Sequence, residues 1–394
     1  MQSLNRFNVI SYLVIVLLAV AFLFVGNRMV GHSPAQDGGE ATIYRARVTA
    51  IVSETEHVTD FETWHAIVFA AEITRGEMRG ETAQFTQNVR GHFLERFPRA
   101  AREGDRIMLG RSAHGAWHFI DYVRIHQIII LGGVFMLMII IFGRSKGFNA
   151  LLALGLTAGA VFLVFIPSIL AGRNIYFWSI LVCMYTVLVT LFIINGISQK
   201  TAAAITGCIG GVVAAGVLTF VMNTTMMLTG ITQTESVNLL YMTDVPINLN
   251  AIIFAGIIIG AVGAIMDMAV SVSSALWELK EKQPDLEFHE IFKSGIQIGK
   301  DILGSNINTL VLAYIGSSLT IILILLGWDV SLFRLMNREL IIVELLKAIV
   351  GSFGIFLTMP LTAFICGLLY TGGFQRRTPK IEEIPEEDFP FFMK

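Results

Sequence analysis

Long runs of apolar residues constrain this chain more than any other feature of its sequence. A helix that crosses the roughly 30 Å hydrocarbon core of a bilayer needs about 20 mostly apolar residues. Eight runs approach or exceed that length, and they predict eight membrane-spanning helices. The runs cover residues 8–26, 127–143, 148–171, 175–195, 201–222, 249–272, 302–327 and 345–371.

The composition excludes several classes of protein. The chain has 394 residues, of which 54% are hydrophobic and only 15% are charged, whereas soluble domains carry about 25% charged residues. A soluble multidomain enzyme and a largely disordered chain are therefore both excluded. The net charge of −2 provides no basic field that would attract nucleic acid. The three cysteines lie in apolar runs without CxxC spacing, so we expect neither disulfides nor a zinc site.

The distribution of Lys and Arg predicts the orientation in the membrane, because cytoplasmic loops carry an excess of these residues. With a cytosolic N-terminus, the inner segments hold many more basic residues than the short outer loops. We therefore expect a plasma-membrane protein with both termini cytosolic and residues 27–124 outside. The inner residues are Arg6, Arg144, Lys146, Lys200, Lys280, Lys282, Lys293, Lys300, Arg376, Arg377, Lys380 and Lys394, and the outer ones are Arg173, Arg334 and Arg338.

The first apolar run is interpreted as an uncleaved anchor over residues 1–26. A cleaved signal peptide, with a core of about 7–15 residues and small residues at the cleavage site, is the alternative. Here the core is longer, and Gly26, Asn27 and Arg28 do not resemble such a site. Under either interpretation, the segment that follows is exported.

The exported segment, residues 27–124, has the alternating pattern of β-strands separated by glycine-containing turns. The pattern predicts strands at 42–53, 64–74, 81–89, 105–110 and 116–123, and a short helix at 91–101. Five strands in so short a segment suit a small β-rich barrel of an OB-like kind. The histidines of this segment match no compact ligand motif, so we expect no metal and no cofactor. They are His32, His57, His65, His92, His114 and His118.

Polar residues within the apolar runs mark the candidate functional site, because a charge in hydrocarbon is costly. In the sixth run, four polar residues fall at i, i+4, i+7 and i+11 and so share one helical face. Gly256 and Gly260 before them form a GxxxG pattern that lets a neighbouring helix approach, and Gly207 and Gly211 repeat this packing signal in the fifth run. The four polar residues are Asp267, Ser271, Ser274 and Glu278.

The seventh run begins with a similar stripe, Asp301, Ser305 and Asn308, at i, i+4 and i+7. A hairpin of the sixth and seventh runs would face these two polar ladders towards each other. Before and within the last run, Glu344 and Lys347 stand at i, i+3, which suits a local ion pair near the extracytoplasmic face.

Two interpretations of these stripes remain open. In the first, they line a path for an ion or small solute, with Asp267 as a protonatable or cation-binding carboxylate, and the protein is a transporter or channel. In the second, Asp267 is hydrated near the cytosolic interface, and the Ser and Asn side chains only hold helices together.

Enzymatic activity is not expected. Residues 295–301 (GIQIGKD) lack the spacing and the Ser or Thr of a phosphate-binding loop, and neither H-E-x-x-H nor G-x-S-x-G occurs. An intramembrane aspartyl hydrolase using Asp267 and Asp301 ranks lower because the flanking residues do not fit. A non-catalytic scaffold whose exported barrel binds a protein partner stays a competitor to transport.

Three segments carry a resemblance to a known family. Residues 260–279 (GAVGAIMDMAVSVSSALWEL), 293–319 and 344–363 resemble the YibE/F-like family of bacterial multi-pass membrane proteins, over roughly residues 125–372. The resemblance implies a seven-helix membrane domain in the plasma membrane, following an exported segment. It implies no settled activity. We expect residues 373–394 to form an acidic cytosolic tail. The expected partners are the bilayer, a small ion or solute, and an extracytoplasmic protein, but no nucleic acid.

Overall fold

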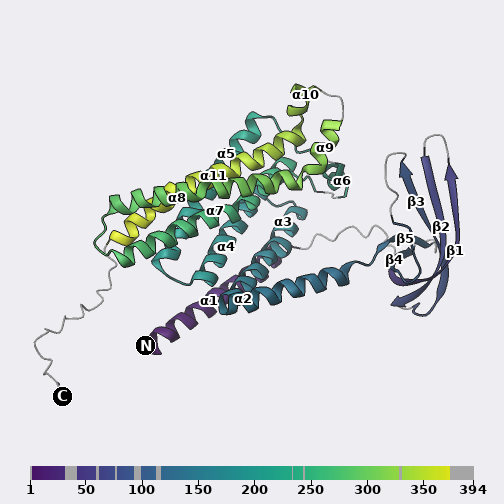
Figure 1. Ribbon diagram of the computed structural model, residues 1–394, viewed down its shortest axis with the longest axis horizontal. Helices are drawn as coiled ribbons and strands as arrows, with labels where there is room; N and C mark the ends of the chain where they lie inside the picture. Colours follow the sequence, from purple (N-terminus) through teal and green to yellow (C-terminus); the bar gives the residue numbers. More distant parts are fainter. Residues whose placement is uncertain are drawn as a thin grey trace, which may run out of the picture. The chain divides into compact units, whose positions relative to one another are not determined.

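The computed structural model describes residues 2–31, 42–58, 62–75, 78–92, 99–111, 117–232, 234–242, 245–327 and 331–372. The chain divides into two compact units (Figure 1). One is the helical unit, which combines Met1–Ser33 with Ser145–Lys394, and the other is the β unit, Pro34–Arg144. The acidic tail lies outside the described residues.

The β unit contains an antiparallel sheet of five strands in the order β3-β2-β1-β4-β5. All five strands predicted from the sequence are present. The predicted helix at 91–101 is not found at its start, because β3 continues through His92, and residues 93–98 lie outside the described part. The strands are β1 (Thr42–Val58), β2 (Glu62–Arg75), β3 (Thr82–His92), β4 (Arg106–Arg111) and β5 (Trp117–Tyr122).

Alternating apolar residues give the β unit its own core. Phe69 of β2 is fully buried and lies against Phe85 of β3 and Phe119 of β5, with ring centroids 6.0 and 6.4 Å apart. Ile107 and Leu109 of β4 are also fully buried. This period-two burial follows from the pleat, which sends successive side chains to opposite faces.

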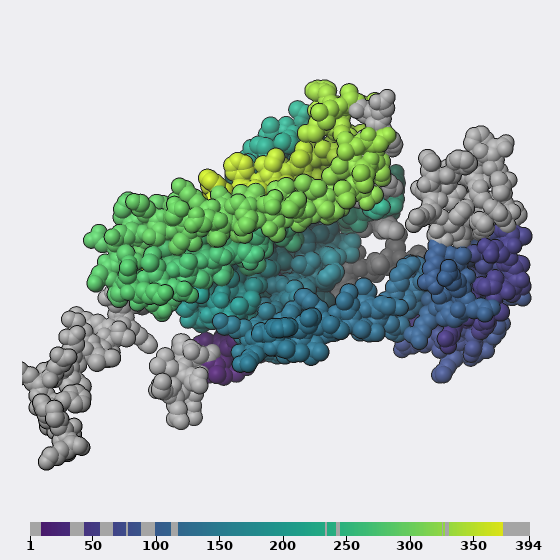
Figure 2. Space-filling model, in the orientation of Figure 1, coloured from purple at the N-terminus to yellow at the C-terminus, as the bar shows by residue number. Residues whose placement is uncertain are grey.

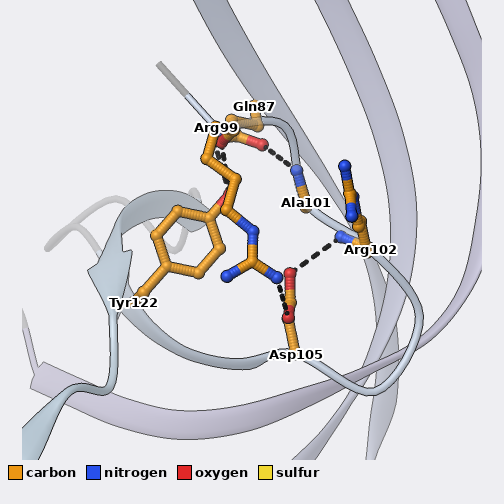
Figure 3. Close-up of polar contacts among 6 residues, drawn as sticks. All are labelled: Gln87, Arg99, Ala101, Arg102, Asp105 and Tyr122. Atoms are coloured by element: carbon orange, nitrogen blue, oxygen red, sulfur yellow. Dashed lines mark hydrogen bonds and ion pairs between the residues drawn. The ribbon is translucent and has the colours of Figure 1, made fainter.

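A buried glutamine links the two edge strands of this sheet (Figure 3). The Gln87 amide on β3 donates to the Tyr122 hydroxyl on β5 and to the Arg99 carbonyl, and it accepts from the Ala101 N–H at 2.9 Å. Tyr122 also donates to the Arg99 carbonyl at 2.6 Å. Asp105 fixes the following turn through the Arg99 guanidinium and the Arg102 N–H. β3 and β5 therefore approach each other, although no backbone ladder joins them among the described residues.

The described residues of the helical unit, together with the first part of α2, form long helices and several short ones. Six segments are long and apolar enough to cross a membrane: Val9–Val30, Ile125–Leu170, Ile175–Asn195, Gln199–Thr225, Leu249–Lys282 and Glu339–Thr371. The helices are α1 (Gln2–Val30), α2 (Ile125–Gly159), a π-helical turn (Ala160–Phe165), α3 (Ile166–Leu170), α4 (Ile175–Asn195), α5 (Gln199–Thr225), α6 (Thr234–Met242), α7 (Leu249–Lys282), α8 (Phe288–Ser317), α9 (Leu319–Gly327), α10 (Leu332–Met336) and α11 (Glu339–Thr371).

Two differences separate these six segments from the eight predicted runs. The runs 127–143 and 148–171 join into one 46-residue segment, although Arg144 inside α2 has non-helical angles, φ 48° and ψ −127°. The run 302–327 is divided by a break at Ser318 between α8 and α9. Polar residues such as Lys300 and Asp301 make α8 amphipathic, so it is not among the six. Eight crossings stay a prediction.

α7 is the centre of the helical unit, where α4, α5, α8 and α11 all pack against it. α8 and α11 run alongside it in Figure 1. The predicted small-residue contact is present on α5, where Gly207 and Gly211 lie against Thr362 and Thr358 of α11. A methyl group at either glycine would overlap a threonine hydroxyl, so these glycines permit the close approach of the two helices.

Candidate functional site

The four polar residues predicted on one face of α7 share one side of the helix, which we call the α7 polar stripe (Asp267, Ser271, Ser274 and Glu278). Asp267, Ser271 and Glu278 are exposed, and Ser274 is half-buried. The opposite side carries fully buried apolar residues such as Ile265. α7 therefore buries its apolar side against neighbouring helices, and the described residues leave most of the stripe uncovered.

The stripe residues also keep their hydrogen-bonding capacity. Among the described residues, none of the four side chains has a hydrogen-bond or ion-pair partner. The adjacent Ser273 behaves differently, because it is fully buried and its hydroxyl donates to the Val270 carbonyl at 3.2 Å. The stripe is thus available to water, an ion or another molecule.

Three glycines extend the same side of α7 towards its N-terminus. The predicted close approach occurs at one of them, since a Cβ at Gly260 would lie 2.6 Å from the Tyr314 hydroxyl of α8. At Gly256 and Gly263 the space is open for at least 4 Å. Among the described residues, the Tyr314 side chain alone contacts the GxxxG pattern, and no helix backbone packs against it.

The polar stripe of α8 does not face the α7 stripe, contrary to expectation. Asp301, Ser305 and Asn308 are all exposed, and in Figure 2 the residues of α8 form part of the viewed surface. The α8 side that packs on α11 instead carries Gly295 and Gly299, which lie against Ala363 and Met359. Glycines let the helix axes come close, so this side takes the contact and turns the polar side outwards.

Local partners satisfy part of the α8 stripe. Asp301 accepts a hydrogen bond from the Gln297 amide at 3.3 Å, and the Ser305 hydroxyl donates to the Ile302 carbonyl. No hydrogen bond joins Asp301 to Asp267 among the described residues. The described residues therefore show no hydrogen bond of the kind that an acid–base dyad of these two carboxylates would form.

The predicted ion pair on α11 is confirmed. Lys347 Nζ lies 2.6 Å from Glu344 Oε1, and their side chains are 27% and 17% exposed. The Ser318 hydroxyl, at the junction of α8 and α9, donates to the other carboxylate oxygen of Glu344 at 2.7 Å. This hydrogen bond connects the N-terminal part of α11 to the end of α8.

A cavity of about 380 Å³ adjoins this ion pair, and we call it the α6/α11 cavity. Its walls come from α6 and the residues just before it, the first turns of α7 and the first turns of α11. Gly256 belongs to its lining, so the glycine end of the exposed α7 side reaches the cavity. No sequence pattern indicates this cavity, since α6 and α11 are almost a hundred residues apart.

Tyr314 is a polar residue of the site that sequence reasoning missed. Its hydroxyl is buried, rests against Gly260 and has no hydrogen-bond partner among the described residues. A buried hydroxyl without a partner costs free energy. The only signal in the sequence is a tyrosine one helical turn before Ser318, on a different side of α8 from the predicted stripe.

The described residues contain no group of three or more His, Cys, Asp or Glu side chains that could hold a metal ion. His118 is exposed on β5. His32 and His114 lie outside the described residues. The chemistry offered by the α7 stripe, the α8 stripe and the ion pair is thus that of carboxylates, hydroxyls, an amide and one ammonium group.

Several long apolar helices, with a small antiparallel sheet domain, indicate a membrane protein. Comparison with known families shows to which family the chain belongs. The model of the YibE/F-like protein family matches residues 131–372, more than half of the chain, so the chain belongs to this family and the resemblance is confirmed. The match includes the α7 stripe, the α8 stripe and the Glu344–Lys347 pair. No curated protein and no solved structure matches the chain.

Proposed function

We propose that this protein transports a small cation across the plasma membrane along the α7 polar stripe, with Asp267 as the cation-binding or protonatable carboxylate. The observation that carries this proposal is an uncovered carboxylate in the middle of a long apolar helix. The proposal requires that Asp267 lie deep in the bilayer and that the stripe favour positive charge.

The length of α7 supports a deep position for Asp267. Trp277 near the C-terminal end of the helix donates a hydrogen bond to Glu281, and Lys280 and Lys282 follow. Such residues mark a membrane interface. Asp267 lies ten residues before Trp277, which is about 15 Å along the axis. That is half of a hydrocarbon core roughly 30 Å thick.

The charge of the stripe supports a cation. Both ionisable residues of the stripe are carboxylates, and it contains no basic residue. An ionised Asp at the bilayer centre costs about 2.5–3.5 kcal/mol on insertion scales, so its presence points to a function. The space at Gly263, one helical turn before Asp267, is open and leaves room beside the carboxylate for a partly hydrated ion.

The proposed topology places both termini in the cytosol and residues 27–124 outside. The excess of Lys and Arg on one side supports this orientation. The eight predicted runs are even in number, so they return the chain to its starting side, and they direct α7 from the outer face towards the cytosol. Glu278 then lies at the cytosolic end of the stripe, and Glu344 lies towards the outer end.

The test is transport by the full-length protein in liposomes. Entrapped indicators would report the flux of protons, Na⁺, K⁺ and Mg²⁺ for wild type and for Asp267→Asn. We expect wild-type flux above that of empty liposomes and at least a tenfold loss in Asp267→Asn, because neutralisation removes roughly 1.4 kcal/mol or more of cation binding. Asp301→Asn serves as a matched control, because Asp301 is a carboxylate on the exposed face of α8. The flux of this variant should stay within about twofold of wild type.

Two results would contradict the proposal. Equal flux in wild type and Asp267→Asn would remove this carboxylate from the path. Flux no greater than that of empty liposomes, for every cation and for both proteins, would contradict transport and favour a scaffold.

The second candidate function is a membrane scaffold whose exported domain binds a protein partner. A separate core and the strand order β3-β2-β1-β4-β5, with Gln87 linking β3 to β5, support an OB-like barrel that could serve as such a module. The full-length protein, immobilised in detergent, would be incubated with cell-envelope extract. A partner lost when residues 42–124 are deleted would support this function, and identical captures would contradict it.

A further inference from the structure

The α6/α11 cavity has the size of an organic ligand site. Its volume of about 380 Å³ corresponds to roughly a dozen water molecules at about 30 Å³ each. That is larger than a bare ion needs, and it lies within the range of about 300–1,000 Å³ found for small-molecule pockets. Most of its wall is aliphatic, including Leu239, Ile252, Ile253 and Val343.

The polar part of the lining combines two carboxylates with one ammonium group. Glu344 is paired with Lys347, and Glu235 of α6 adds a second carboxylate. Thr232 and Ser236 contribute hydroxyl groups. With Lys347 neutralised by Glu344, the lining keeps one negative charge and so favours a cation over an anion.

The Lys347 side chain already shows how an alkylammonium group fits this carboxylate. Its Nζ lies 2.6 Å from Glu344 Oε1, and the other oxygen of Glu344 is held by Ser318 at 2.7 Å. A free amine could take the place of Nζ if Lys347 turned away, and its alkyl part would then contact the aliphatic wall. Because both side chains are partly exposed, the exchange does not require the helices to separate.

The geometry points to the α6/α11 cavity as a binding site for a small organic amine in its alkylammonium form. Its ammonium group binds Glu344 in competition with Lys347, and its alkyl chain packs against the aliphatic residues of α7 and α11. As a binding site the cavity is independent of the proposed function. A role of the cavity as the outer entrance to the α7 polar stripe, with Gly256 and Tyr314 between the two, rests on the proposed function.

The experiment measures binding of n-butylammonium, the free analogue of a lysine side chain, to the full-length protein in detergent by titration calorimetry. Butyrate serves as the anionic counterpart. We expect saturable binding of n-butylammonium and none of butyrate. Lys347→Met should bind n-butylammonium about tenfold more tightly, because the internal competitor is removed, and Glu344→Gln should lose binding.

A pair of glycine variants tests the location without altering any charge. Gly256→Leu places a side chain in the cavity, where the space at Cβ is open, and should abolish binding. Gly304→Leu is the matched control, since Gly304 is also exposed with open space but lies on α8 outside the cavity. It should bind as wild type does. This pair remains informative if Lys347→Met fails to fold.

Three outcomes would overturn the inference. They are absence of n-butylammonium binding in both wild type and Lys347→Met, equal binding by Gly256→Leu and Gly304→Leu, and butyrate binding that Lys347→Met abolishes. Asp267→Asn separates this inference from the proposed function. It should bind n-butylammonium normally even if its cation flux is lost, and normal flux with normal binding would contradict only the proposed function.

Discussion

Replacing Gln87 by Met tests whether its amide holds the two edge strands of the β unit together. Gln87 is only 5% exposed. Met has a similar length and no hydrogen-bonding amide, so the change removes the polar contacts while filling nearly the same space. The Tyr122 hydroxyl keeps its own hydrogen bond to the Arg99 carbonyl at 2.6 Å.

The expected cost follows from the groups that lose a partner. The buried Ala101 N–H, which donates to Gln87 Oε1 at 2.9 Å, is left without an acceptor, at a cost of about 1–3 kcal/mol. The two bonds donated by Nε2 are long, at 3.3 Å each, and add roughly 0.5 kcal/mol together. Burial of the more apolar Met offsets about 0.5–1 kcal/mol. The net loss is therefore about 2 kcal/mol, or roughly 30-fold in the opening equilibrium.

Hydrogen exchange followed by mass spectrometry in the full-length protein measures this loss. Amides of β3 and β5 should exchange about 30-fold faster in Gln87→Met, while those of α7 stay unchanged. Gln84→Met is the control, because Gln84 lies on the same strand but is exposed. Unchanged protection in Gln87→Met, or an equal effect of Gln84→Met, would refute the reasoning.

Three further predictions concern single groups. Tyr314→Phe removes a buried hydroxyl that has no partner among the described residues and should raise the free energy of unfolding by about 1 kcal/mol, measured as a higher Tm in detergent; a lower Tm would contradict the assignment. Gly207→Val should lower the free energy of unfolding by about 2 kcal/mol or more, because its side chain would overlap Thr362 of α11; an unchanged Tm would contradict the close contact. The Arg124 guanidinium, by hydrogen bonding, holds the pKa of the Asp121 carboxyl below its ordinary value of 3.8. A lowered folded-state pKa gives stability that is present above about pH 4 and is lost as the pH falls through the folded value. Protection of β5 amides should therefore fall below about pH 4 in wild type, and Asp121→Asn should weaken that dependence; an identical profile would exclude the pair as its source.

The sequence was a good guide wherever one periodicity determined the outcome. Alternation located all five strands, because a strand with one buried face has a strict period of two. The spacing of Asp267, Ser271, Ser274 and Glu278 placed them on one side of α7 for a similar reason, since residues at i, i+4 and i+7 share a helical face. The i, i+3 spacing of Glu344 and Lys347 likewise predicted their ion pair.

The direction in which a helical face points could not be predicted in the same way. α8 carries both a polar side and a glycine side, and its own sequence does not say which one meets a neighbour. Close packing of Gly295 and Gly299 on α11 decided it, and that depends on Ala363 and Met359, about sixty residues further along the chain. The α6/α11 cavity was missed for the same reason.

The hydrogen bonds in the bundle bear on the choice between the two interpretations of the α7 polar stripe. Several hydroxyls buried in the helical unit are satisfied within their own helices, as in Thr219 to the Ala215 carbonyl and Thr358 to the Gly354 carbonyl. Ser271 and Ser274, in contrast, form no hydrogen bond with other described residues, and neither does Asp267. If these groups served only to join helices, their partners would be found within the bundle, because unsatisfied polar groups in hydrocarbon are costly. Asp267, Ser271 and Ser274 instead lie on a side of α7 where the space at Gly263 is open, which is the arrangement that the proposed cation path requires.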